Sequence, residues 1–171
     1  MASETTFAEL FAATRESAVH LEMRDCYTPD DPSFIAWLED GRIVDDPESQ
    51  EWRALVRATV NRGVSVRRAR IVSEPLSDYI RYEHAVTAGH NIAAGEEVRW
   101  LPRRLATNVA LPGNDFWLFD GQTLLVNHFS GGSDWIGMEI DPDPSAVRLC
   151  AEAFEAVWSC AVPHEDYKPA A

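Results

Sequence analysis

The stretch Gly113–Phe129, GNDFWLFDGQTLLVNHF, contains the strongest structural signal in the sequence. An apolar run, Phe116–Phe119, precedes Asp120-Gly121, and a second apolar run, Leu124–Val126, follows it. Asp-Gly between two hydrophobic runs predicts a β-hairpin, because Gly tolerates the positive φ that a tight turn needs. Consecutive apolar residues in a strand are typical of burial on both faces. We therefore expect this hairpin in the middle of a sheet.

The segments around the hairpin alternate between helical and strand patterns. Asp31, Asp46 and Asp143 each precede a proline, which is typical of a helix start, since Asp caps the first turn and Pro fits its first position. Ser17–Arg24 alternates apolar and polar residues, which predicts a strand with one face exposed. We expect helices over residues 7–15, 33–38, 47–62, 76–88 (capped by Ser73) and 144–162, strands over residues 17–24, 64–72, 97–101 and 135–140, and a loop over residues 89–95.

The length and composition indicate one globular domain. With 171 residues, 46% of them hydrophobic and 25% charged, the chain can bury a core of ordinary size. Helical and strand segments alternate along it without repeats or long linkers. The fold class that we predict is α/β, a single domain over residues 1–171 with a mixed central sheet flanked by helices.

Several functional classes are disfavoured by composition. The net charge of −13 argues against direct nucleic-acid binding, because phosphate contacts require basic surface. The opening residues have no basic or apolar leader, and no apolar run approaches membrane-spanning length, so we expect a cytoplasmic protein that does not contact a membrane. Three cysteines without CxxC spacing, and the absence of HxH, HExxH and Gly-rich phosphate motifs, predict no metal and no cofactor.

The basic residues have an uneven distribution. Fourteen of the fifteen are Arg, and six of these lie between Arg53 and Arg70. Since Arg binds carboxylates and phosphates through a planar fork, this set could form an anion pocket. A compositional preference for Arg over Lys explains the same set without a site.

The order of elements from residue 64 to residue 163 resembles a phospholipase D-like half-domain, and the closing FEAVWSCAVP of residues 154–163 is similar to the last helix of such domains. That family carries a His-x-Lys-x-x-x-x-Asp motif, and Asp120 matches its Asp. Gly113 stands at the His position and Asp115 at the Lys position. The resemblance therefore implies a degenerate domain without phosphodiesterase chemistry.

A second resemblance extends over the whole chain. Its motifs are SEPLSDYIRYE (73–83), AGE (94–96), LPR (101–103), DFWLFD (115–120) and VPHEDY (162–167). These motifs are similar to those of an uncharacterised actinobacterial family, a domain of unknown function often encoded beside small helix-turn-helix regulators. The resemblance implies a regulatory neighbourhood and no activity.

The candidate site residues are charged or aromatic side chains near the predicted strand ends. We select Glu74, Asp78, Tyr79, Arg81, Arg99, Arg103, Asp115 and Asp120. Ligands of open α/β sheets bind beyond the carboxyl ends of strands, where residues 73–78 are expected. The alternative is structural, with acidic residues complementing a helix N-terminus and Asp120 serving the hairpin turn.

Two functional hypotheses follow. The first is a non-enzymatic regulatory domain, a ligand-sensing or protein-interaction module of a helix-turn-helix system, with a basic regulator as protein partner or a small anionic ligand. The second is a small-molecule hydrolase or transferase that uses Glu74, Asp78, Arg81 and Asp115, which requires a carboxylate with a raised pKa in a cleft.

Overall fold

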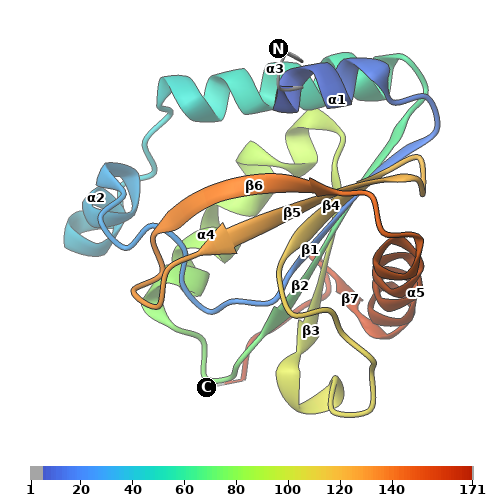
Figure 1. The fold of residues 1–171 in the computed structure, drawn as a ribbon. Helices are drawn as coiled ribbons and strands as arrows, with labels where there is room; N and C mark the ends of the chain where they lie inside the picture. Colours follow the sequence, from blue (N-terminus) through green and yellow to red (C-terminus); the bar gives the residue numbers. More distant parts are fainter. Residues whose placement is uncertain (1–5, 171) are drawn as a thin grey trace.

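The computed structural model describes residues 6–170, so the expectation drawn from the opening residues 1–5 lies outside the described range. One α/β domain is built around a mixed sheet of seven strands in the order β6-β5-β4-β1-β2-β3-β7 (Figure 1). Strands β1, β2 and β3 are parallel, and the other pairs are antiparallel. The strands are β1 (Ser17–Glu22), β2 (Ser65–Val72), β3 (Glu97–Pro102), β4 (Phe116–Phe119), β5 (Thr123–Phe129), β6 (Trp135–Asp141) and β7 (Val162–Pro163).

Helices cover both faces of this sheet. They are α1 (Phe7–Ala13), α2 (Pro32–Asp40), α3 (Pro47–Asn61), α4 (Asp78–His90) and α5 (Pro144–Cys160), with short 3-10 turns η1 (Ile92–Ala94) and η2 (Arg103–Leu105). Figure 1 shows α5 on one face and α1, α3 and α4 on the other, with α2 beside α4. In residues 6–170, no helix combines the length and apolar character that crossing a membrane requires.

The predicted hairpin is confirmed as β4 and β5, and it lies inside the sheet. All residues of β4 are buried, and β4 pairs with β1 on one side and β5 on the other. Asp120 and Gly121 form the turn with φ of 51° and 66°. The Asp120 carboxylate also accepts hydrogen bonds from the backbone N–H groups of Arg15, Glu16 and Ser17. This carboxylate therefore ties the turn to the start of β1.

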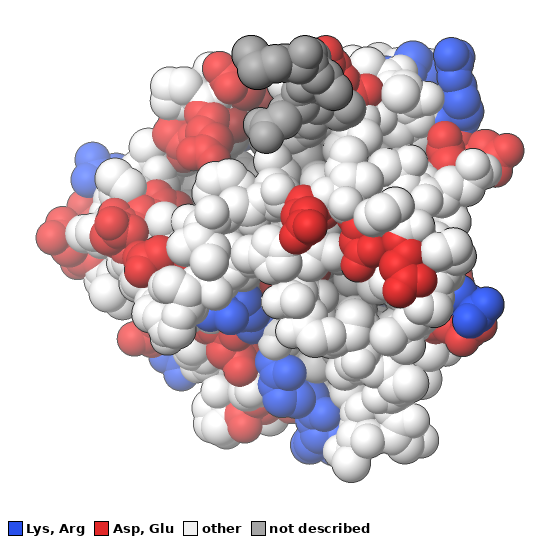
Figure 2. Space-filling model, in the orientation of Figure 1, with Lys and Arg blue, Asp and Glu red and all other residues white. Residues whose placement is uncertain are grey.

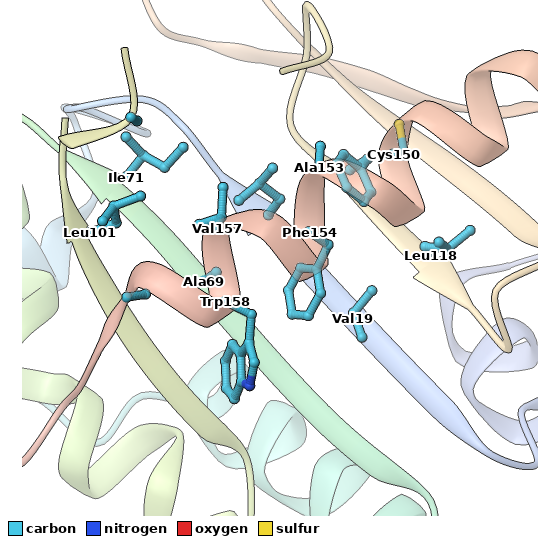
Figure 3. Packing of buried hydrophobic residues seen from close by; sticks show 14 of the residues in the cluster. Val19, Ala69, Ile71, Leu101, Leu118, Cys150, Ala153, Phe154, Val157 and Trp158 are labelled. Atoms are coloured by element: carbon cyan, nitrogen blue, oxygen red, sulfur yellow. The ribbon is translucent and has the colours of Figure 1, made fainter. Parts of the chain in front are cut away.

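The α5 face contains an apolar core. Phe154, Val157 and Trp158 of α5 lie against Val19 of β1 and Leu101 of β3 (Figure 3). Trp158 is 9% exposed, and Phe154 is fully buried. The amphipathic pattern that predicted the last helix therefore faces the sheet as expected.

The structure departs from three sequence-based expectations on the opposite face of the sheet. β1 is not half-exposed: its alternating polar residues, His20 and Glu22, are buried beneath α3 and α4. Helix α4 begins at Asp78 with Ser77 as its cap, because the Ser73 side chain and N–H instead bind Asp25. The helix also continues to His90, two residues into the segment 89–95 that was expected to be a loop, and the 3-10 turn η1 occupies residues 92–94 of that segment.

Candidate functional site

The register between β1 and β2 brings polar side chains together on the buried α3–α4 face. Because the two strands are parallel, His20 lies beside Arg68 and Glu22 beside Arg70. All four side chains point to the same face, since residues two apart in a strand share a face. Polar groups that are distant in the sequence thus become neighbours in the interior.

We call Glu22, Arg68, Arg70, Glu83 and Glu96 the buried ion network. Glu22 accepts hydrogen bonds from Arg68 Nη1 and from Arg70 Nε, both at 2.5 Å. Arg68 Nε donates to Glu96 at 2.7 Å, and Arg70 Nη2 donates to Glu83 at 2.5 Å. Arg70 is 3% exposed and Glu96 is 2% exposed. Burial at this level requires the charges to be paired, and each one is.

The pKa values of two glutamates in the network, Glu22 and Glu83, are shifted in opposite directions. Burial disfavours the charged form of Glu22, but Arg68 and Arg70 outweigh this effect and hold its pKa well below the usual range. Burial raises the pKa of Glu83, because the attraction of Arg70 does not offset it and the charge of Glu22 adds to it. Glu22 is therefore the firmly ionised centre, and Glu83 is protonated more easily than Glu22.

A cavity of about 700 Å³ opens above the network, bounded by α2, α3 and α4. We call it the α3–α4 pocket. Arg68, Arg70 and Glu83 lie in its floor, and its aromatic walls are Trp52 of α3 and Tyr79 and Tyr82 of α4. Pockets of roughly 300–1,000 Å³ with apolar walls and a few convergent polar groups are typical of small-molecule sites. This pocket has the size of such a site, and its lining combines three aromatic residues with a larger number of polar and charged residues.

The tyrosines of the wall remain hydrogen-bond donors at neutral pH. Burial raises the pKa of the Tyr79 and Tyr82 phenols, and the negative charges of Glu83 and Asp31 add to the effect. A protonated phenol offers a ring face and an O–H group to a ligand.

A second, smaller cavity of about 100 Å³ adjoins the other side of the network and contains Asp115. Asp115 is 3% exposed, and it accepts hydrogen bonds from the Tyr27 hydroxyl and, at 2.9 Å, from the Met23 N–H. His20 Nδ1 donates to the Phe116 carbonyl at 2.7 Å, and His20 Nε2 lies 3.2 Å from Glu22. Burial raises the pKa of the Asp115 carboxyl despite its two donors.

Replacing Asp115 is expected to change the pH dependence of stability. A carboxyl with a raised folded-state pKa binds its proton more tightly when folded. Its stabilising contribution is thus complete below the ordinary value of about 3.9 and is lost as the pH rises through the raised value. Asp115→Asn should therefore gain stability relative to the unmodified protein as the pH rises from about 4 to about 7. Urea unfolding at several pH values measures this gain, with the exposed Asp166→Asn as control. A gain that shrinks towards neutral pH would contradict the assignment.

The structure separates the residues selected for an enzyme. Glu74 accepts a hydrogen bond from the Tyr167 hydroxyl at 2.9 Å and lies in a shallow hollow beside Arg103. Asp78 and Arg81 form an exposed pair at 3.2 Å on the first turn of α4. Asp115 lines the small cavity on the other side of the network. These residues do not share one cleft.

The remaining selected residues have structural contacts, with one exception. Arg99 donates to the Trp158 carbonyl at 3.0 Å and stacks over the Trp158 ring. Arg103 joins loops by donating to the Ser73 hydroxyl and to the Met23 carbonyl. Asp120 serves the hairpin turn. Tyr79 is the exception in that it lines the α3–α4 pocket in addition to packing against Phe34 in the core.

Sequence reasoning missed the members of the buried ion network as site residues. A signal was present: His20 and Glu22 are two positions apart in Ser17–Glu22, Arg68 and Arg70 are two positions apart in Ser65–Val72, and both segments are strands of a mostly apolar sheet. Pairing those alternations would have put Glu22 beside Arg70. In residues 6–170, His, Cys, Asp and Glu side chains form no group of three or more that could hold a metal ion.

Comparison with known families places the chain. The sequence model of the family described as "Domain of unknown function (DUF6879)" matches residues 5–169, so the chain belongs to that family. No curated protein matches the sequence.

Two solved structures resemble the fold weakly. TrmBL2, an archaeal chromatin protein with a novel mode of DNA binding, has 12% identity and a TM-score of 0.49, with 91% of this chain and 48% of TrmBL2 covered. Nuc from Salmonella typhimurium, a phospholipase D family member, has 13% identity and a TM-score of 0.49, with 91% of this chain and 86% of Nuc covered. The chain thus spans about half the length of TrmBL2. We draw no activity from either likeness.

The partner prediction made from net charge is corrected by these findings. The prediction of no direct nucleic-acid contact is contradicted by this comparison, because TrmBL2 is a chromatin protein that binds DNA, although a likeness at a TM-score of 0.49 assigns no DNA binding to this chain. Total charge sums over the whole molecule, whereas phosphate contacts depend on a local surface. Figure 2 shows that charged side chains are unevenly distributed on this face, with acidic and basic groups side by side in places and uncharged surface elsewhere. The prediction of a basic protein partner came from the same total charge, and we do not carry it further.

Proposed function

We propose that this member of the DUF6879 family is a ligand-sensing regulatory domain, and that its ligand occupies the α3–α4 pocket. The observation that supports this most is the cavity of about 700 Å³ whose floor is formed by Arg68, Arg70 and Glu83 of the buried ion network. Groups with perturbed pKa values that converge in a cavity are a physical indication of a functional site.

The hydrogen bonds in the floor of the pocket connect α4 to the sheet, and this connection would allow a bound ligand to affect the position of the helix. Glu83 lies on α4 and binds Arg70, and Arg70 also binds Glu22 of β1 and the Thr87 hydroxyl. A ligand that contacts Glu83 would therefore shift an ion pair that joins α4 to the two central parallel strands. A change of this kind would bias the position of α4 relative to the sheet.

The regulatory setting is part of the proposal and rests on the sequence motifs. The motifs at residues 73–83, 94–96, 101–103, 115–120 and 162–167 resemble an actinobacterial family encoded beside helix-turn-helix regulators. We propose that the domain acts in such a system in the cytoplasm.

A pocket-filling variant tests the proposal. Ser49 lines the α3–α4 pocket, and Ser49→Trp should fill part of it, while the backbone N–H of residue 49 can still donate to the Asp46 carboxylate that caps α3. In a thermal-shift screen of small metabolites of all charge classes, we expect compounds that raise the Tm of the unmodified protein and not that of Ser49→Trp.

The control is Ser159→Trp, the same substitution at an exposed position of α5 on the opposite face of the sheet. This variant should respond to the same compounds as the unmodified protein. Compounds that stabilise Ser49→Trp equally well would place their site elsewhere and overturn the proposal, and so would a screen without any stabilising compound.

A further inference from the structure

We infer that the α3–α4 pocket binds an organic cation, a small amine or guanidinium compound. This inference rests on the proposed function and adds the chemical class of the ligand. It replaces the anionic ligand that the run of arginines suggested. The argument uses the charge balance of the pocket, the state of its arginines and its aromatic walls.

The two arginines of the floor are already occupied. Arg68 donates through Nε and Nη1, and Arg70 donates through Nε, Nη1 and Nη2, to protein acceptors that include three glutamates. An anionic ligand would have to displace buried carboxylates that bond these arginines at 2.5–2.7 Å. The floor thus has little basic character left for a ligand.

The charge around the pocket is negative overall. In the network, three glutamates face two arginines, which leaves one negative charge. Asp31, Asp46 and Glu48 add three more around the opening. Burial opposes ionisation of Asp46, but hydrogen bonds from Ser49 and Ser33 outweigh it and lower its pKa, so this carboxylate is charged.

The helix ends around the pocket reduce this charge without reversing it. The N-termini of α2 and α3 open onto the pocket, and each contributes about half a positive charge. Asp31 and Asp46 cap these two termini and more than cancel them. The C-terminus of α4, at His90 and Asn91, also lines the pocket and contributes a partial negative charge.

The aromatic walls favour the same class of ligand. Trp52, Tyr79 and Tyr82 line the cavity, and the face of an aromatic ring attracts a cation. The protein itself already uses this contact, because the Arg68 guanidinium lies 5.4 Å from the Trp52 ring centroid. Carboxylates combined with ring faces suit an ammonium or guanidinium group, and the volume admits an aryl or alkyl body behind that group.

Three matched compounds test the inference by calorimetric titration at low salt. They are 2-phenylethylamine, 2-phenylethanol and 3-phenylpropanoate, which share a phenyl group and differ in charge. We expect the amine to bind about tenfold more tightly than the alcohol and the carboxylate to bind more weakly than both, since each charge meets a negative pocket. Added salt should reduce the advantage of the amine.

Charge reversal on α3 supplies the matched variants. Glu48 lines the pocket and Glu51 does not, and both are exposed. Glu48→Lys and Glu51→Lys change the net charge equally, so a difference between them reports local charge. We expect Glu48→Lys to weaken amine binding by about tenfold, and Glu51→Lys by less than about twofold.

The outcomes separate this inference from the proposed function. If the carboxylate binds more tightly than the amine and Ser49→Trp abolishes its binding, the pocket is the ligand site but the cationic class is wrong. If amine binding is unaffected by both Glu48→Lys and Ser49→Trp, its site lies elsewhere and both ideas fail. Failure of the amine to bind at millimolar concentration overturns the inference, while the metabolite screen with Ser49→Trp still decides the proposed function.

Discussion

Glu22→Gln is expected to lower the free energy of unfolding by about 3–5 kcal/mol, with a drop in Tm of roughly 10 °C. The Glu22 carboxylate joins Arg68 to Arg70 in the interior. Its removal leaves the positive charges of two buried guanidinium groups only partly neutralised. A neutral amide also turns a donor towards one of these guanidinium groups. Urea unfolding followed by tryptophan fluorescence measures the loss.

The control for this substitution is Glu155→Gln. Glu155 also pairs with an arginine, Arg67, at 2.8 Å, but its side chain is 61% exposed. An exposed pair contributes about 0–1 kcal/mol, so this variant should unfold close to the unmodified protein. Equal effects of the two substitutions would show that the network does not stabilise the fold.

The effect of Glu22→Gln should depend on pH in a definite direction. Because Arg68 and Arg70 hold the pKa of Glu22 well below its usual range, its contribution is present above about pH 4.3 and is lost as the pH falls through the folded-state value. The stability difference between the unmodified protein and Glu22→Gln should therefore narrow in acid. A difference that widens in acid would contradict the ionised state of Glu22.

Phe154→Ala has the other large expected effect, a loss of about 3–5 kcal/mol. Phe154 is fully buried between α5 and the sheet, where it lies against Val19 and Leu118, and the Arg67 guanidinium lies 5.0 Å from its ring centroid. Truncation removes its apolar surface and leaves a cavity that the packed strands cannot fill. Thermal unfolding and urea unfolding should report the same loss.

Leu149→Ala provides the comparison on the same helix. Leu149 is 38% exposed, so its truncation should cost less than about 1 kcal/mol. A loss at Leu149 as large as the loss at Phe154 would mean that α5 is sensitive to any truncation, and that packing of Phe154 on the sheet is not the cause.

The ligand experiments use positions outside both of these stabilising regions. Glu48 and Glu51 lie on the exposed side of α3, and neither belongs to the buried ion network or to the α5 core. Differences between their variants in amine binding should therefore arise from charge near the pocket and not from partial unfolding. The Tm of each variant without ligand checks this assumption.

Local signals predicted the elements that depend on short-range physics. The hairpin followed from Asp120-Gly121, since only a few residue types adopt positive φ at low cost. The starts of α2, α3 and α5 followed from Asp31, Asp46 and Asp143, each of which caps its helix through a nearby backbone N–H. The cap of α4 was placed wrongly at Ser73, because a tertiary contact with Asp25 uses that side chain.

The candidate site could not be predicted in the same way. Glu22 and Arg70 are 48 positions apart, and only the parallel pairing of β1 with β2 makes them neighbours. The alternation of Ser17–Glu22 indicated one polar face, and an exposed face is the usual reason for such a pattern. Here a helical layer with its own carboxylate, Glu83 of α4, covers that face.

The sequence by itself determined the fold class, the central hairpin, the helix starts that carry Asp-Pro, and the membership in a family with a recognisable set of motifs. These features depend on backbone preferences and on the period of apolar residues, which act over a few positions. The tertiary structure alone decided which charges are buried, which arginines are neutralised, and where a cavity remains. The physical reason is that Coulomb pairing and burial depend on distance in space, and strand order and register set that distance.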